Sequence, residues 1–451
     1  MQAVILQGEN MISIGFIEPS SEYLFDPFRG DPFTHFYILT ILEDHFGSQI
    51  QAKLIDLRGI KKEFAIYHIP ECDIYLHSVY TLDYNEQLFL VKTIQETYPK
   101  SIHLAGGPHV REFTRENMDI FDSLILGEGE IIIVKAVEDF LGGRLQKIYQ
   151  EKIPVDINAY PFGRRNFLPK SITARKNMVG LRKKQGFENL IGTTVIFSRG
   201  CPYSCHFCAL RQSREDFPGI RYRSPDNVKK EIEYLKKEFN VKAIVLQDEI
   251  CVPLRKDLAR THLEAIGETG IIWRGQCRVD GVTEETAKLM KASGCIAMGM
   301  GVESVNQLSL NIINKNIDIE RSRKTIELLK RNDIEVRIYM IMGLPGEPTD
   351  IVDQTWKFIE ETNPDLVVLS LFTVRPGTEM YNNPNKFGLK LLKTDWSKTM
   401  HMWSRYDNEE PTLTFEYLKD QGLPNQTIIK NYLELQKRLK ERNIGTAFYK
   451  K

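Results

Sequence analysis

Three of the seven cysteines lie in one short segment, which reads Cys201-Pro-Tyr-Ser-Cys205-His-Phe-Cys208. Three thiolates at this spacing can bind three corners of an iron–sulfur cube and leave the fourth iron open, whereas a closed zinc site takes four ligands. His206 is a possible fourth ligand, but it lies between two cysteines in a tight loop, so we expect its ring to point away. The alternative is three unrelated buried cysteines. The spacing favours a metal centre in a reducing compartment.

The elements that position these cysteines belong to a stretch, residues 192–380, in which short apolar strands alternate with amphipathic helices. This pattern predicts a parallel sheet covered by helices. Six βα units without a clear seventh and eighth predict an open, partial (β/α)6 TIM-type barrel, with its chemistry at the carboxyl ends of the strands. The cysteine segment directly follows the first of these strands. The expected strands are residues 193–199, 243–248, 271–279, 295–302, 335–343 and 366–374.

A similar alternation over residues 11–140 predicts an α/β domain with a doubly wound, Rossmann-like sheet of about five strands. Such sheets bind ligands at the carboxyl ends of their strands. No G-x-G-x-x-G opens a helix after the first strand, so we do not expect an ordinary dinucleotide site. The expected strands are residues 11–19, 51–58, 72–78, 101–107 and 123–127, and the polar residues and glycines at their ends are Ser78, Gly106, Gly107, Gly127 and Glu128.

The stretch between the two sheets contains three prolines and is strongly basic, because residues 164–184 hold eight lysines and arginines and no acid. It is either a solvated basic linker or a docking site for an acidic partner or substrate. Residues 426–442 have the pattern of one amphipathic helix. The expected parts of the chain are a Rossmann-like domain (1–150), a linker (151–190), a partial barrel (191–385) and a small helical C-terminal tail (386–451).

The overall composition is that of an ordinary globular protein, with 451 residues, 42% apolar and 27% charged. Sixty basic and 60 acidic residues give zero net charge, so nothing global attracts the chain to nucleic acid or to an acidic membrane. The longest apolar runs are far shorter than the ~20 residues that span a bilayer. The start of the chain lacks a secretory signal. We therefore expect a cytoplasmic protein with no membrane or nucleic-acid partner.

The cysteine segment at the end of the first strand of a six-stranded partial barrel resembles the radical S-adenosylmethionine (radical SAM) superfamily. The resemblance implies that Cys201, Cys205 and Cys208 hold a [4Fe–4S] cluster whose open iron is chelated by the amino and carboxylate groups of SAM. An electron from the cluster then cleaves SAM to methionine and a 5′-deoxyadenosyl radical. Five later strand ends agree with this resemblance: residues 247–249, 273–280, 300–304, 343–347 and 375–378.

The resemblance also implies a set of SAM contacts. Phe207 would lie along the adenine, and Arg278 would pair with the SAM carboxylate. Hydrogen bonds from the SAM amine or ribose hydroxyls would be accepted by Asp248 or Glu249 and by Glu303. The alternative for the carboxylates and the arginine is a salt-bridge network at the barrel mouth.

The other four cysteines are scattered, and we expect them to be core residues. They leave no ligands for the second cluster of the sulfur-inserting methylthiotransferases or for the C-terminal auxiliary cluster of many peptide-modifying radical enzymes. These cysteines are Cys72, Cys251, Cys277 and Cys295.

The N-terminal sheet is similar to the cobalamin-binding domain of the B12-dependent branch of this superfamily. The similarity implies that Gly106, Gly107 and Gly127 let the backbone approach the corrin and its nucleotide tail, while Glu128 begins a helix, where an acid is favoured. The D-x-H-x-x-G motif that supplies a histidine to cobalt in many B12 domains is absent. We expect Tyr80 nearest the cobalt, with Ser78 at the nucleotide tail. The alternatives are a Tyr80 packed in the sheet and a degenerate domain that binds nothing.

The resemblance implies a cobalamin-dependent radical SAM methyltransferase. It would methylate an unactivated carbon of a peptide, a protein side chain or a small metabolite through a 5′-deoxyadenosyl radical and methylcobalamin. An electron donor such as ferredoxin or flavodoxin would serve the cluster. One alternative is a cobalamin-binding radical SAM enzyme that catalyses a cyclisation or rearrangement without methylation. Another is a non-catalytic iron–sulfur sensor.

Overall fold

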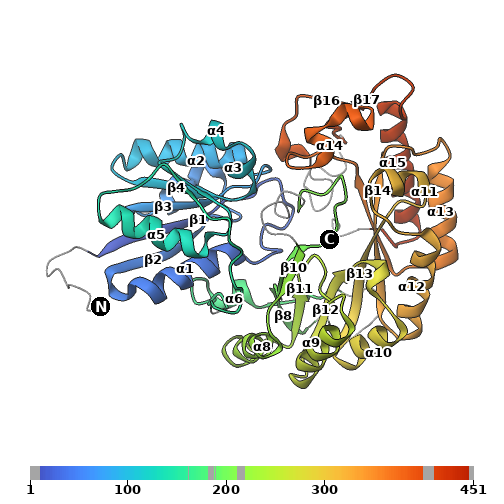
Figure 1. The fold of residues 1–451 in the computed structure, drawn as a ribbon, viewed down its shortest axis with the longest axis horizontal. Coiled ribbons are helices and arrows are strands. Elements are labelled where there is room, and N and C mark those ends of the chain that lie inside the picture. Colours follow the sequence, from blue (N-terminus) through green and yellow to red (C-terminus); the bar gives the residue numbers. More distant parts are fainter. Residues whose placement is uncertain are drawn as a thin grey trace. The chain divides into compact units, whose positions relative to one another are not determined.

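The computed structural model describes residues 11–160, 162–180, 187, 189–210, 219–399 and 411–445. The chain forms two compact units, which we call unit 1 (residues 1–169) and unit 2 (residues 170–451) (Figure 1). The division falls inside the stretch 151–190 expected to be a linker. Within the described ranges, no helix is both long enough and apolar enough to cross a membrane.

Unit 1 is built on a six-stranded parallel sheet with the order β2-β1-β3-β4-β5-β6. Because β2 and β3 flank β1, the order of the sheet reverses there, and in such sheets ligands bind at the strand ends beside the reversal. All five expected strands are present, and a sixth short strand extends the edge. The strands are β1 (Ile12–Glu18), β2 (Ile50–Asp56), β3 (Ile74–Ser78), β4 (Ile102–Gly106), β5 (Ser123–Leu126) and β6 (Ile148–Gln150).

Helices cover both faces of this sheet, which confirms the doubly wound arrangement (Figure 1). On one face, Leu39 and Val137 from two of the helices pack with Ile14 and Leu76 of the sheet. On the other face, Leu90 packs in one cluster with Tyr75 of β3. The helices are α1 (Phe33–Phe46) and α5 (Gly129–Leu141) on the first face, and α2 (Tyr84–Thr97), α3 (Pro108–Glu112) and α4 (Thr114–Asn117) on the second.

Two arginines of the basic stretch belong to the structure of unit 1. Arg165 is 1% exposed, and its Nη1 donates to Asp31 at 2.8 Å. The Arg165 guanidinium also lies 5.5 Å and 5.4 Å from the ring centroids of Phe33 and Phe36. Arg164 donates to Glu43 at 2.8 Å. Arg165 is thus buried in unit 1 and is not part of a solvated loop. Residues 181–186 of the stretch lie outside the described residues.

Unit 2 contains a curved seven-stranded sheet with the order β15-β14-β13-β12-β11-β8-β7. Six strands run parallel and form the expected partial barrel, while β7 (Arg175–Lys176) was not expected and pairs antiparallel with β8 at one edge. The six parallel strands are β8 (Ile191–Val195), β11 (Ala243–Leu246), β12 (Ile272–Cys277), β13 (Cys295–Glu303), β14 (Glu335–Met342) and β15 (Leu366–Leu371).

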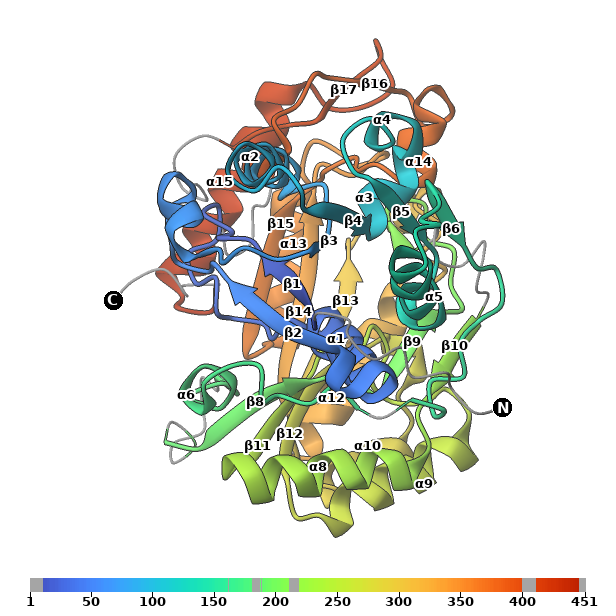
Figure 2. The same cartoon turned by 90° about the vertical axis from the view of Figure 1, so that its left-hand side faces the viewer.

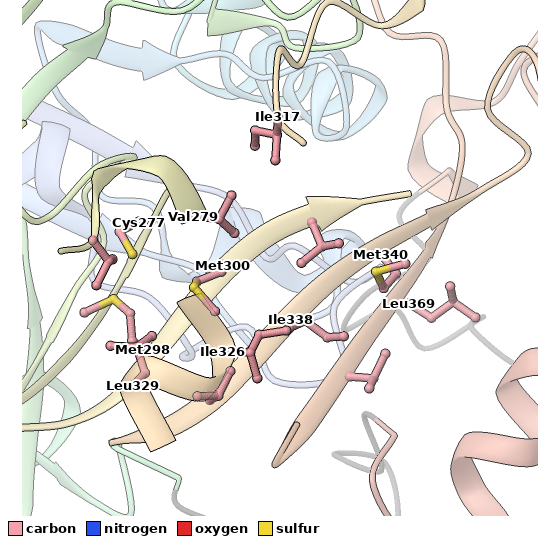
Figure 3. Close-up of a cluster of buried hydrophobic side chains, with 14 of the residues drawn as sticks. Cys277, Val279, Met298, Met300, Ile317, Ile326, Leu329, Ile338, Met340 and Leu369 are labelled. Carbon is pink, nitrogen blue, oxygen red and sulfur yellow. The ribbon is translucent and has the colours of Figure 1, made fainter. Parts of the chain in front are cut away.

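The barrel core lies between these strands and the helices that follow them (Figure 2). Met300 of β13, Ile338 of β14 and Ile326 of a covering helix meet in one apolar layer (Figure 3). Ser224 caps the first of these helices by accepting from the Asn227 amide, as its place before a proline predicts. The main helices are α8 (Pro225–Phe239), α9 (Lys256–Glu268), α10 (Glu284–Ala292), α11 (Gln307–Ile312), α12 (Ile319–Arg331) and α13 (Ile351–Thr362).

The cysteine segment does not directly continue the first barrel strand, which corrects the expectation from the sequence. β8 ends at Val195, and β9 (Ser198–Cys201) pairs antiparallel with β10 (Gly219–Tyr222) in a separate two-stranded ribbon. Gly200 has a φ of 89°, and a Cβ there would lie 2.5 Å from the Gly219 carbonyl oxygen. Glycine is therefore required where the two strands of the ribbon approach.

The C-terminal stretch contains the expected helix, α15 (Asn425–Glu441), and also a hairpin of β16 (Leu389–Leu391) and β17 (Phe415–Tyr417). Ile428 and Leu435 of α15 are fully buried in the barrel core. After α15, the Ile444 carbonyl accepts from the Val367 amide of β15 at 2.8 Å. The stretch thus covers the outer edge of β15, where unpaired backbone groups would otherwise be exposed.

Candidate active site

The three cysteines of the segment come from one loop that begins at the last residue of β9. Cys205 is buried, and Cys201 and Cys208 are half-buried. The Cys208 amide donates to the Cys205 carbonyl at 3.2 Å and closes a turn between them. Burial raises the pKa of Cys208 to about 12 and also raises the pKa of Cys201. The thiolate forms therefore need a compensating positive charge, which a bound metal centre supplies.

A single metal ion has no ready site in this loop. Within the described ranges, no three Cys, His, Asp or Glu side chains come close enough together to hold one metal ion. Cysteine thiolates are also the ligands of iron–sulfur clusters, and a cluster is larger than a single ion. Three half-buried or buried thiols on one loop are the type and number of ligands that a cluster with one open iron would take.

His206 fixes the loop through four contacts. Its ring Nδ1 lies 2.9 Å from the carbonyl of Ile312, the last residue of α11, and donates to it. Its amide donates to the Ile313 carbonyl at 2.9 Å, and its carbonyl accepts from the Met380 amide at 3.3 Å. The ring also lies 5.1 Å from the Phe387 ring. His206 therefore anchors the cysteine loop to neighbouring elements.

Arg278, at the end of β12, brings a positive charge to the cysteine loop. Its Nη1 lies 3.8 Å from the Cys205 sulfur, and its guanidinium carbon lies 3.6 Å from the ring centroid of Tyr203. The same guanidinium donates to both carboxylate oxygens of Asp280 and, at 2.7 Å, to the carbonyl of Lys315. Arg278 thus takes part in the salt-bridge network that was the alternative to a SAM carboxylate contact.

Glu303, the last residue of β13, is engaged in the same network. The Lys315 ammonium donates to Glu303 Oε1 at 2.7 Å, and both side chains are buried. Glu303 has a φ of 66°, and a Cβ at Gly301 would overlap its carboxylate. Sequence reasoning missed Lys315, because nothing in the short Asn-rich turn around it indicates a buried partner.

The two acids after β11 differ in their surroundings. Asp248 is buried, and its Oδ1 accepts from the Phe197 amide at 2.9 Å and from the Ser198 hydroxyl at 2.5 Å. Burial raises the Asp248 pKa to about 6. Asp248 therefore ties β9 to the end of β11, whereas Glu249 is exposed and remains accessible to a ligand. Phe207 is half-buried and packs against the barrel core.

In unit 1, the loop after β3 holds the two residues expected nearest the cofactor. Ser78 is the last residue of β3 and is buried. Tyr80 is 50% exposed, and its hydroxyl hydrogen-bonds with the side chains of Ser78 and Thr34. Its exposed ring lies just beyond the strand ends, where a ligand of such a sheet would lie.

Two of the residues assigned to the cofactor have roles within the fold. Gly107 has a φ of 102°, and a Cβ there would lie 2.8 Å from the Val79 carbonyl oxygen. Gly106 is less restricted, because its Cβ would lie 3.3 Å from the Ile125 carbonyl oxygen. Glu128 precedes α5, as expected, but its Oε2 accepts from the Val155 amide at 2.7 Å. Packing and hydrogen bonding within unit 1 thus account for the residue types at positions 107 and 128 without a ligand. Gly127 has a φ of 109°, a backbone conformation that favours glycine.

Sequence reasoning missed two acids near the same strand ends, half-buried Glu18 and buried Asp83. Burial raises the pKa of Glu18, the last residue of β1, to about 8, although Arg58 opposes the shift. Burial likewise raises the pKa of Asp83 to about 7. Asp83 Oδ1 is buried and has no hydrogen-bond partner among the described residues. The only signal in the sequence was an acid that ends the apolar run Gly15-Phe-Ile-Glu18.

Comparison with known proteins gives a family match for part of the second unit. Residues 195–359 match the model of the radical SAM superfamily. An anaerobic magnesium-protoporphyrin IX monomethyl ester cyclase of Rubrivivax gelatinosus is 32% identical over 205 residues, which are 45% of this chain and 36% of that protein. An uncharacterized methyltransferase of Pyrococcus horikoshii is 26% identical over 353 residues, which are 74% of this chain and 72% of that protein. The chain therefore spans only about a third of the cyclase.

The same fold occurs in a solved structure. The radical S-adenosylmethionine methyltransferase TsrM of Kitasatospora setae, with cobalamin and a [4Fe–4S] cluster bound, superposes with a TM-score of 0.68. The match covers 95% of this chain and 91% of TsrM at 15% sequence identity. At this identity the likeness is one of fold.

Proposed function

Residues 195–359 form a radical SAM domain, and from this premise we propose that the chain is a cobalamin-dependent radical SAM methyltransferase acting on an unactivated carbon. The observation that carries the proposal is the match of both units, over 95% of the chain, to the fold of TsrM, a methyltransferase solved with both cofactors. An uncharacterized methyltransferase that aligns with 74% of this chain at 26% identity gives further support. The substrate is a peptide, a protein side chain or a small metabolite.

In this proposal the cysteine loop and its neighbours hold the cluster and SAM. When bound, the cluster supplies the electron that cleaves SAM, and cobalamin carries the methyl group. Cys201, Cys205 and Cys208 are the cluster ligands. Arg278, 3.8 Å from the Cys205 sulfur, offsets part of the negative charge of the three thiolates. An electron donor such as ferredoxin or flavodoxin reduces the cluster.

The exposed and half-buried groups around the loop are the proposed SAM contacts. Exposed Glu249 accepts from the SAM amine or a ribose hydroxyl, and Phe207 lies along the adenine. Glu303 is paired with Lys315, so the two side chains contact SAM together. Glu303 accepts hydrogen bonds from SAM and Lys315 donates them. Asp248 acts indirectly, by holding Ser198 of β9 in place.

Unit 1 offers a fit for cobalamin at its strand ends. Tyr80 presents an exposed ring there, which we place nearest the cobalt, with Ser78 at the nucleotide tail. Asp83 Oδ1 is a buried acceptor without a partner among the described residues, as expected where a ligand supplies the donor. The glycines 106, 107 and 127 keep this edge free of side chains.

Replacement of single cysteines tests the cluster. Reconstituted protein is expected to hold one [4Fe–4S] cluster per chain and to form 5′-deoxyadenosine from SAM under anaerobic conditions. Cys208→Ala should lose most of the iron and all of the SAM cleavage. The matched control is Cys295→Ala, a buried cysteine on β13, which should keep both. Full SAM cleavage by Cys208→Ala would contradict the ligand assignment, and no cleavage by the wild type would favour an iron–sulfur sensor.

A second candidate function is a cyclisation or rearrangement without methylation. It is favoured by the 32% identity to the Rubrivivax gelatinosus cyclase, the relative with the higher identity of the two. The mass of the product formed with SAM and cobalamin separates the candidates. A gain of one methyl group supports the methyltransferase, and a product formed without that gain supports the cyclase.

A further inference from the structure

Tyr417 lies in β17, outside the residues 195–359 that match the family model, yet it reaches a turn at the end of a barrel strand. Its hydroxyl donates to the Gly343 carbonyl at 2.9 Å. The Tyr417 ring occupies a slot that exists because residue 422 is glycine, since a Cβ there would overlap the ring. Phe415 packs against the ring edge-on at 5.2 Å. The hydrogen bond is therefore fixed by the hairpin and the turn that follows it.

The other side of the same turn is held by Glu347. The Gly343 amide donates to Glu347 Oε2 at 2.8 Å, and Glu347 is buried. Gly343 has a φ of 97°, and a Cβ there would lie 2.7 Å from Ile428 Cγ2 of α15. The amide, the carbonyl and the α-carbon of Gly343 are thus each restrained, the last two by the C-terminal stretch.

The turn is connected to the cysteine loop through a single residue of α11. A Cβ at Gly346 would lie 2.8 Å from Ile312 Cδ1, so the turn packs closely on that side chain. The Ile312 carbonyl in turn accepts from His206 Nδ1 at 2.9 Å, between the second and third cysteines. A displacement of the turn would therefore reach the loop that holds the cluster.

We infer that Tyr417 is a positioning residue for the SAM-binding face of the barrel. Its hydroxyl holds the Gly343 carbonyl, so that the turn of residues 343–347 keeps its place against Ile312 and the cysteine loop. The C-terminal stretch thereby completes a binding face that the family-matched residues begin. The inference rests on the proposed function, because SAM is the ligand that this face would bind.

The test is Tyr417→Phe, which removes the hydroxyl and leaves the ring in its slot. Loss of one neutral hydrogen bond corresponds to about a two- to tenfold change in an equilibrium constant. We expect the dissociation constant of SAM, and its KM, to rise by about this factor, with kcat and iron content close to the wild type. Gly422→Ala, which displaces the ring, should weaken SAM binding in the same way.

The matched control is Tyr432→Phe. Tyr432 is buried on α15, and its hydroxyl accepts from Gln436 Nε2 at 2.6 Å. This variant should lose stability without a change in SAM affinity. If the wild type binds SAM and Tyr417→Phe binds it equally well, the inference is wrong and the proposed function stands. If the cluster-loaded wild type does not bind SAM, the proposed function fails and the inference fails with it.

Discussion

Glu347 shows how a single buried residue couples the site to pH. Its Oε2 accepts from the Gly343 amide, while its Oε1 is buried without a hydrogen-bond partner among the described residues. Burial raises the pKa of Glu347 from 4.5 to about 8. Between these two values the unfolded chain releases a proton that the folded chain retains. The free energy of unfolding should therefore fall as the pH rises through this window.

Glu347→Gln should remove this pH dependence, because glutamine keeps an acceptor for the Gly343 amide and does not ionise. The slope of the unfolding free energy against pH should become shallower by up to about 1.4 kcal/mol per pH unit. The difference in unfolding free energy between the variant and the wild type should therefore grow across the window and favour the variant most near pH 8. Denaturant unfolding across the window measures this. Glu416→Gln, on the exposed side of β17, is the control. Parallel profiles for wild type and Glu347→Gln would count against the raised pKa.

The parts of the candidate site whose residues lie close together in the sequence could be predicted from the sequence alone. The cysteine loop is one such part, because all three cysteines lie within eight residues. The partners of Glu303 and Gly343 could not be predicted, since Lys315 and Tyr417 are 12 and 74 residues away in the chain. Contacts of this kind depend on tertiary packing, which residue spacing does not encode.

At the scale of elements, the ends of the strands in unit 1 depend on close backbone approach. Gly107 follows β4 with a φ of 102°, and the Val79 backbone occupies the space that its Cβ would need. We predict that Gly107→Ala lowers the free energy of unfolding by about 1–3 kcal/mol through backbone strain, with a further cost from the overlap. Urea unfolding of the protein without cofactors measures the change.

The control for this variant is Gly143→Ala, because Gly143 also has a positive φ of 65° but has open space around its Cβ position. It should show the strain without the overlap, and so a smaller loss. If the two variants lose the same stability, the close approach to Val79 has no cost. The reason for a glycine at position 107 would then be the one expected from the sequence, namely the close approach of the backbone to a cofactor.

Regular elements could be predicted well, because alternating apolar strands and amphipathic helices carry a strong periodic signal. All six parallel barrel strands and α15 lie where the sequence indicates. The ribbon of β9 and β10 was missed, because Ser198–Cys201 looks like the continuation of the first barrel strand. Only its pairing with Gly219–Tyr222, and the close contact at Gly200, reveal a separate element.

At the scale of the whole molecule, each unit contains its own buried arginine–carboxylate pair. In unit 1, Arg165 donates to Asp31 at 2.8 Å, only four residues before the division of the chain at Pro169. In unit 2, Arg337 of β14 pairs with Glu335 at 3.0 Å and donates to the Gly180 carbonyl at 2.6 Å. Each arginine thus ties residues near the division to the core of its own unit.

Removal of one partner from a buried ion pair costs about 3–5 kcal/mol, because the other charge is left without compensation. We therefore predict that Arg165→Ala increases amide hydrogen exchange in β1 and α1 of unit 1 and leaves the barrel strands protected. Arg337→Ala should do the reverse, with faster exchange in β13–β15 and no change in unit 1. Exchange measured peptide by peptide gives both results in one experiment. If Arg165→Ala loosens the barrel strands as much as it loosens β1, the two units unfold as one and the division at Pro169 has no energetic meaning.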